Sequence, residues 1–250
     1  MQEPLAVYSV EEDWGNCLKM QSNMIRHIHH YLVNENVPYD LLTHFTSYAI
    51  SRIHKSLTAV RMLMESELLA DARSILRTMV ELVVTYRYVV KSPEKSISRF
   101  LEFDDILSYE LICAWEKHKP SLRFDTDRKN YLAANYAQNK ERYPILYHWC
   151  DVTLDSMADE TGMKLWYDAV YLPGTLHDHP DLPGVCECVN RPFNPLDLRI
   201  QSDLPPGTDV MKKSCQLAVM LLESAAAAVR EEAGELEDTW KRCREELNPF

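Results

Sequence analysis

The sequence predicts an all-α protein, an antiparallel helical bundle with a long Pro-rich loop and a long C-terminal helix. Three observations predict this fold class. Apolar residues recur at helical spacing along most of the chain, which is the main sequence signal of secondary structure. The chain of 250 residues contains only six glycines, whereas turn-rich β architectures generally need more. No alternation of apolar and polar residues predicts a strand.

Two long helices are predicted at the start of the chain. The first spans about 11–34 and ends at the break formed by residues 34–38, and the second spans about 39–66. Each has apolar residues three and four positions apart, as expected when one face packs against a core. The apolar residues of the first are Trp14, Leu18, Ile25, Ile28, Tyr31 and Leu32.

A central helix is predicted over about 69–91, because its apolar residues lie nearly all the way round. A helix that is apolar on every side is usually buried. Arg77 and Glu81 nevertheless lie one turn apart within it. Buried charges persist only when they are paired or hydrogen-bonded, so these two residues predict a polar contact in the middle of the protein.

Two more helices follow the central one. Ser92 is expected to cap a fourth helix with Pro93 at its first helical position, and this helix runs to about 117. A more polar helix is predicted over 126–141. The short connections between the first four helices predict that they are antiparallel neighbours.

The C-terminal half is predicted to be less regular. Thr153 is expected to cap a short helix that ends at Gly162, followed by another from Met163 towards Tyr171. Residues 173–207 contain seven prolines and three glycines, a composition typical of a long loop.

A long helix is then expected from Thr208 or Asp209 to about residue 247, with Gly234 as a break. The predicted organisation is one helical domain over 1–250. It consists of a bundle core (11–180), a Pro-rich loop (181–207) and a long acidic C-terminal helix (208–250).

The charge is distributed unevenly. Residues 1–150 hold 18 Lys and Arg against 19 Asp and Glu, whereas residues 151–250 hold 9 against 19. Non-specific nucleic-acid binding depends on neutralising phosphates with a basic surface. The acidic residues 151–250 argue against such binding, although the charges of residues 1–150 are compatible with a local basic face. A partner protein with a basic surface would suit the acidic C-terminal helix.

Several classes of protein are not indicated. No apolar run is long enough to span a membrane, and no signal peptide is recognised. The seven scattered cysteines resemble reduced thiols, which predicts a cytoplasmic protein. No phosphate-binding glycine loop, nucleophile elbow or H-E-x-x-H helix occurs, so we expect no cofactor and no metal.

Arg77 and Glu81 meet on one helix face and have two interpretations. They form a buried ion pair that fixes packing, or they line a polar pocket in which Arg77 binds an anion such as phosphate. Arg73 and Arg87 would strengthen such a pocket if they faced it.

A second group of polar residues lies in 166–180, with Tyr171, His177 and His179 among them. Histidine titrates near neutral pH, so His177 or His179 could act as a general acid or base. The alternatives are a histidine that bonds loop carbonyls, or a metal site. An H-x-H pair without a separate third ligand is a weak metal signal.

These residues together resemble a bacterial all-helical family of uncharacterised function. The match consists of A-R-x-x-L-R-x-x-x-E from Ala72 to Glu81, then Trp149, the segment 157–162, Tyr167-x-x-x-Tyr171 and His177. It covers roughly residues 20–180. The family in turn resembles the HEPN class of helical bundles, which commonly dimerise and include RNA-cleaving toxins, antiphage effectors and CRISPR nucleases.

The HEPN resemblance implies a metal-independent ribonuclease with an R-x4-6-H site on one helix. The arginine would stabilise phosphate charge, and the histidine would assist proton transfer from the 2′-hydroxyl. Arg142 and His148 have this spacing, but Pro144 interrupts the motif.

The residues that match the uncharacterised family are instead Arg77, Glu81, Tyr171 and His177, which form the first candidate catalytic set. Arg142 and His148 form the alternative.

Two hypotheses follow. In the first, the protein is a HEPN-like ribonuclease or toxin in antiphage defence, a homo-oligomer with RNA or a nucleotide as its partner. In the second, it is a non-catalytic module for dimerisation, scaffolding or sensing a nucleotide or anion. The first predicts that Arg77 and His177 converge at an open cleft, and the second that Arg77 and Glu81 pair in a closed core.

Overall fold

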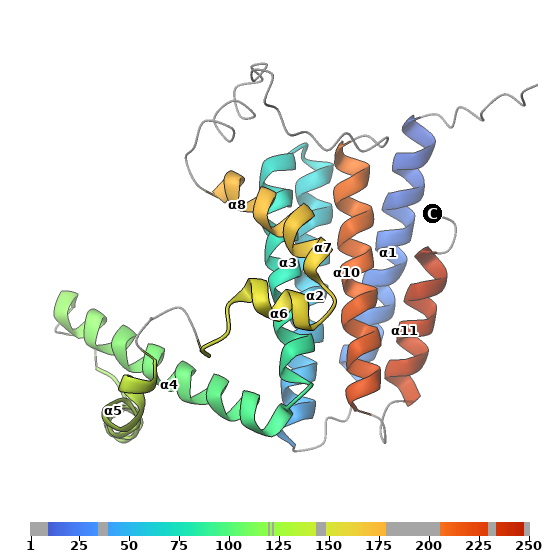
Figure 1. Ribbon diagram of the computed structural model, residues 1–250. Helices are drawn as coiled ribbons and strands as arrows, with labels where there is room; N and C mark the ends of the chain where they lie inside the picture. Colours follow the sequence, from blue (N-terminus) through green and yellow to red (C-terminus); the bar gives the residue numbers. More distant parts are fainter. Residues whose placement is uncertain are drawn as a thin grey trace, which may run out of the picture.

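The computed structural model describes residues 10–34, 40–119, 121, 123–143, 149–178, 206–229 and 234–247, and all regular structure in these ranges is helical. The prediction of an all-α fold is therefore confirmed. Figure 1 shows long helices that lie side by side, with other helices projecting from them to one side. No helix in the described ranges is long and apolar enough to cross a membrane.

The bundle is built from five of the elements in Figure 1. These are α1 (Val10–Asn34), α2 (Leu41–Glu65), α3 (Leu69–Val89), α10 (Pro206–Ala228) and α11 (Gly234–Leu247). Helix α10 packs against α1, α2, α3 and α11. The first three helices lie within two residues of their predicted boundaries.

Helix α3 has the central position that its apolar composition predicts. It packs against α2 and α10, and also against the segment that contains α6 and α8. The side chains of Ala72, Met79, Val80, Val83 and Val84 are fully buried or almost so. Their burial stabilises the fold by about 1.5–3 kcal/mol for each larger aliphatic side chain, relative to exposure.

A short irregular helical segment packs against another part of α3. It comprises α6 (Leu154–Glu160), α7 (Lys164–Trp166), a π-helical turn η2 (Tyr167–Tyr171) and α8 (Leu172–Asp178). The predicted cap at Thr153 is confirmed, because its Oγ1 accepts a hydrogen bond of 3.2 Å from the Ser156 backbone N–H. After α6 the chain reverses at Gly162, whose φ of 70° favours glycine.

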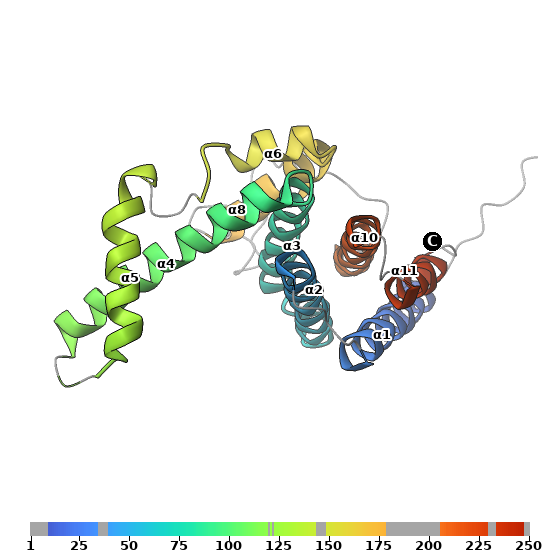
Figure 2. The ribbon, with the colours of Figure 1, turned by 90° about the horizontal axis from the view of Figure 1, so that it is seen from below.

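We call α4 (Pro93–His118), α5 (Thr126–Asn139) and the 3₁₀ turn η1 (Lys140–Arg142) the arm. Seen from below in Figure 2, α4 leaves the bundle at the end of α3, and α5 packs across it. The prediction that the fourth helix lies alongside the third is therefore wrong. Pro93 lies at the start of α4 as expected, but Ser92 makes no capping hydrogen bond with its side chain.

The prediction of one long C-terminal helix over 208–250 is also wrong. Helix α10 ends at Ala228, and α11 begins at Gly234 and packs against both α10 and α1. A straight helix would have left the apolar face of α11 in solvent, whereas the reversal buries Leu236 and Cys243. The proposed break at Gly234 is confirmed as the start of a helix.

Helices extend into both ends of the predicted loop 173–207. At its start, α8 runs through Pro173 and Gly174 to Asp178. Because the π turn shifts the bonding pattern, with the Leu172 N–H donating to the Tyr167 carbonyl, a proline without an N–H is tolerated directly after it. At its end, α10 begins at Pro206 rather than at Thr208 or Asp209, since proline suits a first helical position. The Pro-rich stretch 181–205 lies outside the described residues.

Tyr86 is fully buried in α3 and predicts a response to alkaline pH. Its hydroxyl lies 2.9 Å from Thr46 Oγ1, its ring stacks on Phe45, and burial raises its pKa to about 12. The folded state retains the phenol proton that the unfolded chain loses above about pH 10. We therefore expect the contribution of Tyr86 to the free energy of unfolding to be constant below about pH 10 and to fall between about pH 10 and 12. Urea denaturation at a series of pH values measures it.

The substitution Tyr86→Phe should make this fall smaller. Tyr131→Phe, at an exposed position on α5, is the matched control and should leave the fall unchanged. The same pH dependence in both variants would contradict the assignment to Tyr86.

Candidate functional site

Arg77 and Tyr171, both selected from the sequence, are in direct contact. The guanidinium carbon of Arg77 lies 4.5 Å from the centre of the Tyr171 ring, and Arg77 Nη2 donates a hydrogen bond of 3.0 Å to the Tyr171 hydroxyl. Helix α3 supplies the arginine, and the π turn η2 supplies the tyrosine. A guanidinium over an aromatic face is stabilised by about 0.5–2 kcal/mol, depending on its exposure. The contact therefore fixes the arginine head group.

Glu81 completes this group, which we call the Arg77 site (Arg77, Glu81 and Tyr171). Glu81 Oε2 lies 3.9 Å from Arg77 Nη1, with 22 % of the Arg77 side chain and 48 % of the Glu81 side chain exposed. The predicted ion pair is therefore present, with Arg77 mostly buried and Glu81 about half-exposed. The pair is long and its carboxylate is open to solvent, and such contacts contribute about 0–1 kcal/mol.

Helix α8 crosses α3 directly over Arg77. A Cβ atom placed on Gly174 would lie 2.8 Å from the Cβ of Arg77, closer than two such atoms approach in practice. Glycine is thus required here for the two helices to touch. His177 follows one turn later in α8, so its backbone lies near the Arg77 site, but its side chain lies outside the described residues, as does His179.

The π turn brings Tyr171 to this position. Tyr167 and Tyr171 stack with ring centres 5.0 Å apart, and Lys164 lies over the Tyr167 ring. Lys164 also forms ion pairs with Asp155 and Asp168, which connects α6 to the turn. Single π turns within helices occur frequently at functional sites.

The protonation state of Tyr171 follows from its surroundings. Burial, and then the charge of Glu81, raise the pKa of its hydroxyl, while Arg77 opposes this shift. Tyr171 therefore remains a neutral phenol at neutral pH. Because its oxygen accepts a hydrogen bond from Arg77, its own proton is available to a ligand.

Arg87, which the sequence suggested as a further pocket residue, belongs elsewhere. Its Nε donates a hydrogen bond of 2.9 Å to Ser224 Oγ, and its Nη2 lies 3.9 Å from Glu223 Oε2, both on α10. Burial lowers the pKa of Arg87, while Glu223 opposes the shift. This arginine joins α3 to α10 and takes no part in the Arg77 site. Arg73, the other suggested residue, is half-buried on α3.

The alternative catalytic pair lies in a different region. Arg142 ends the arm, with 69 % of its side chain exposed and its Nη1 3.4 Å from Glu102 Oε2 on α4. His148 lies outside the described residues. Arg142 also lines a cavity at the base of the arm, together with Lys95 and Arg99. Sequence reasoning missed both Lys95 and Arg99, although their i, i+4 spacing near the start of a helix was a usable signal.

Sequence reasoning also missed the role of Gly174. A glycine between two polar residues of the candidate site, in a chain with so few glycines, was the available signal. No group of three or more His, Cys, Asp or Glu side chains within the described ranges could hold a metal ion.

Together these features define an all-α protein with a partly buried Arg–Tyr pair held between its central helix and a π-helical crossing segment. Residues 44–185 match the model of a family of unknown function, DUF5677. The match spans more than half of the chain, and the protein belongs to this family. It runs from the first turn of α2 to beyond α8 and therefore includes the whole Arg77 site. No curated protein and no solved structure matches the chain significantly.

Gly174→Ala tests whether the close crossing of α8 and α3 holds the Arg77 site together. The new methyl group would overlap the Cβ of Arg77, a rigid atom next to the backbone, so the two helices must move apart. We expect a loss of about 1–3 kcal/mol in the free energy of unfolding, measured by chemical denaturation.

Gly15→Ala on α1 is the matched control, because no atom lies within 4 Å of its added Cβ. Alanine favours a helix over glycine, so this variant should be as stable as the wild type or slightly more stable. Equal behaviour of the two alanine variants would contradict the close approach at Gly174.

Proposed function

We propose that the protein is a HEPN-like, metal-independent endoribonuclease that acts in antiphage defence and uses the Arg77 site. The observation that carries this proposal is the guanidinium of Arg77, whose side chain is 22 % exposed, oriented by Tyr171 beneath the helix that bears His177. An arginine fork fixed by stacking is suited to a phosphate group, because its donors match phosphate oxygens in pairs.

The chemistry that this arrangement suits is an internal transfer of the RNA phosphate. The 2′-hydroxyl oxygen would bond to phosphorus while the bond from phosphorus to the 5′ oxygen breaks, which yields a 2′,3′-cyclic phosphate and a 5′-hydroxyl. His177 would take the 2′-hydroxyl proton, and Arg77 would stabilise the charge that develops on the phosphate oxygens. The Tyr171 hydroxyl would protonate the leaving 5′ oxygen and recover a proton from water.

A second candidate function is a non-catalytic module that binds a nucleotide or another small anion. One observation favours it: Arg77 already has Glu81 and Tyr171 as partners, so its charge is balanced without a substrate. In this case an anion would displace Glu81 from Arg77, and no bond would be broken. A homo-oligomer, or a basic partner protein that binds the acidic C-terminal part of the chain, is compatible with either function.

RNA cleavage by the purified protein in EDTA tests the first proposal. We expect cleavage by the wild type, and a loss of about 100-fold or more in His177→Ala, since a general base typically contributes that much. His148→Ala is the matched control and should cleave like the wild type. Loss confined to His148→Ala would transfer the activity to the Arg142 pair, and no cleavage by folded wild type would leave the anion-binding function.

Substitutions of Arg77 separate a structural role from a functional one. We expect Arg77→Ala to remain folded, because the side chain is partly exposed and its ion pair is long, yet to lose cleavage. Arg77→Lys should recover only part of the rate, because an ammonium keeps the charge but not the planar fork. Thermal melting and cleavage are measured on the same samples. Unchanged melting together with unchanged cleavage in Arg77→Ala would exclude any role for this residue.

A further inference from the structure

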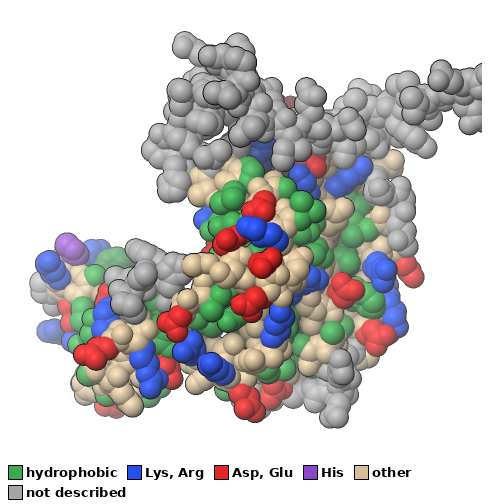
Figure 3. Space-filling view, viewed as in Figure 1, with side chains coloured by type: hydrophobic (Ala, Val, Ile, Leu, Met, Phe, Trp, Pro, Cys, Tyr) green, Lys and Arg blue, Asp and Glu red, His purple; other side chains and the backbone are tan. Residues whose placement is uncertain are grey.

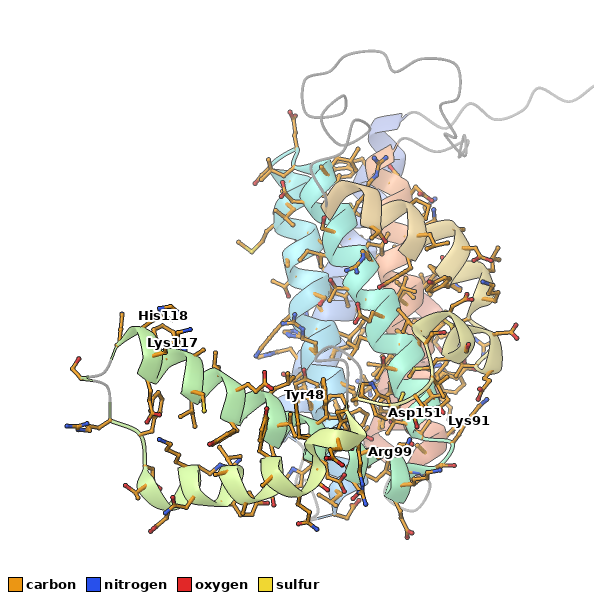
Figure 4. The ribbon with its side chains drawn as sticks, turned by 60° about the vertical axis from the view of Figure 1, so that its left-hand side comes forward. Tyr48, Lys91, Arg99, Lys117, His118 and Asp151 are labelled. Atoms are coloured by element: carbon orange, nitrogen blue, oxygen red, sulfur yellow. The ribbon has the colours of Figure 1, made fainter. Side chains whose placement is uncertain are left out.

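A polar cavity of about 630 Å³ lies at the base of the arm, apart from the Arg77 site. Its walls are the first turns of α4, the end of η1 and residues 150–151. Figure 4 shows Arg99 and Asp151 together at this junction, whereas Lys117 and His118 lie at the far end of α4. The volume is within the range of small-molecule sites, about 300–1,000 Å³.

One face of α4 presents three donors to this cavity. Lys95, Ser98 and Arg99 have i, i+3 and i+4 spacing, so their side chains are neighbours on the helix surface. Within the described part of the chain, Lys95 forms no ion pair and the Ser98 hydroxyl forms no hydrogen bond. These two groups therefore have hydrogen-bonding capacity that the fold leaves unused.

The two carboxylates of the cavity do not cancel this capacity. Glu102 accepts a hydrogen bond of 3.1 Å from the Tyr143 hydroxyl and lies 3.4 Å from Arg142, so its charge is already compensated. Asp151 lies 3.6 Å from Arg99 with 79 % of its side chain exposed. Such a pair contributes little to stability, and an incoming anion can replace the carboxylate at low cost.

The buried residues of the cavity are uncharged at neutral pH. Burial, and then the hydrogen bond and charge of Glu102, raise the pKa of Tyr143 to about 12. Burial likewise raises the pKa of the Cys150 thiol, which donates to the Val152 carbonyl. Neither residue adds a negative charge, so the cationic groups Lys95, Arg99 and Arg142 outnumber the carboxylates here, in a protein of net charge −11.

We propose that this cavity is a second anion site, which binds a phosphate group through Lys95, Ser98 and Arg99. A phosphate has enough acceptor oxygens for the ammonium, the hydroxyl and the guanidinium together, and charge-assisted bonds of this kind are the strong ones. The phosphate can belong to a small phosphorylated molecule or to an RNA backbone. The site does not require catalysis at Arg77, so it does not rest on the proposed function.

The site is local rather than part of an extended basic surface. On the face shown in Figure 3, acidic and basic side chains are interspersed over the arm and the bundle. A long nucleic acid bound along such a face would meet repulsion as well as attraction. We therefore expect recognition of one phosphate group, or of very few, at the base of the arm.

Binding measurements on the full-length protein at low ionic strength test this site. The probes are inorganic phosphate, measured by calorimetry, and a short fluorescent oligouridylate, measured by anisotropy in EDTA. The test variant is Lys95→Ala with Arg99→Ala, and the matched control is Lys117→Ala with His118→Ala, at exposed positions of the same helix. Ser98→Glu is a second test variant, which adds a carboxylate between the two cations and removes no ion pair.

We expect both test variants to weaken binding roughly tenfold or more, and the control to bind like the wild type. Weakening for both probes supports a site for the phosphate group as such. Weakening for inorganic phosphate alone assigns the site to small phosphorylated molecules, and weakening for the oligouridylate alone assigns it to RNA.

Binding of both probes that is unchanged in a folded test variant, or that is absent from the wild type, would overturn the proposal.

Discussion

The structure depends on one constraint, which is that the wide apolar face of α3 must be covered. Exposure of the buried side chains on this face would cost several kcal/mol. Helices α2 and α10 cover most of the face, and the segment from α6 to α8 also packs against α3. The Arg77 site forms where this segment crosses α3. The burial that stabilises the fold therefore also brings Tyr171 onto Arg77.

Many of the helix positions were predictable from the sequence, because they depend on local patterns. Helical periodicity located α1, α2 and α3, and capping chemistry located the start of α6 at Thr153. The contact between Arg77 and Tyr171 was anticipated as a grouping of residues, by resemblance to a family. The chain belongs to a family of unknown function, DUF5677, whose model matches residues 44–185.

The remaining features could not be predicted, because they depend on tertiary packing rather than on local propensity. The direction of α4 is set by which surfaces are already covered when the chain leaves α3. The π turn and the close approach at Gly174 are settled by the fit of two backbones, which no spacing rule describes. The cavity at the base of the arm joins Lys95 to residues 142 and 150, which are far apart in the chain. A single sequence contains no signal for that proximity.

The arm differs from the bundle in the contacts that stabilise it. Its own core consists of Phe103, Ile106 and Tyr143, with a few partly buried neighbours, and ion pairs such as Lys129–Glu116 join α5 to α4. Local unfolding has a low free energy where few apolar contacts are lost. The backbone amides of α5 should consequently exchange with solvent deuterium well before those of α3. The bundle is then the late-exchanging part of the protein, and the arm is an appendage that unfolds locally by itself. Because residues of the appendage line the cavity at its base, a ligand bound there would slow that opening.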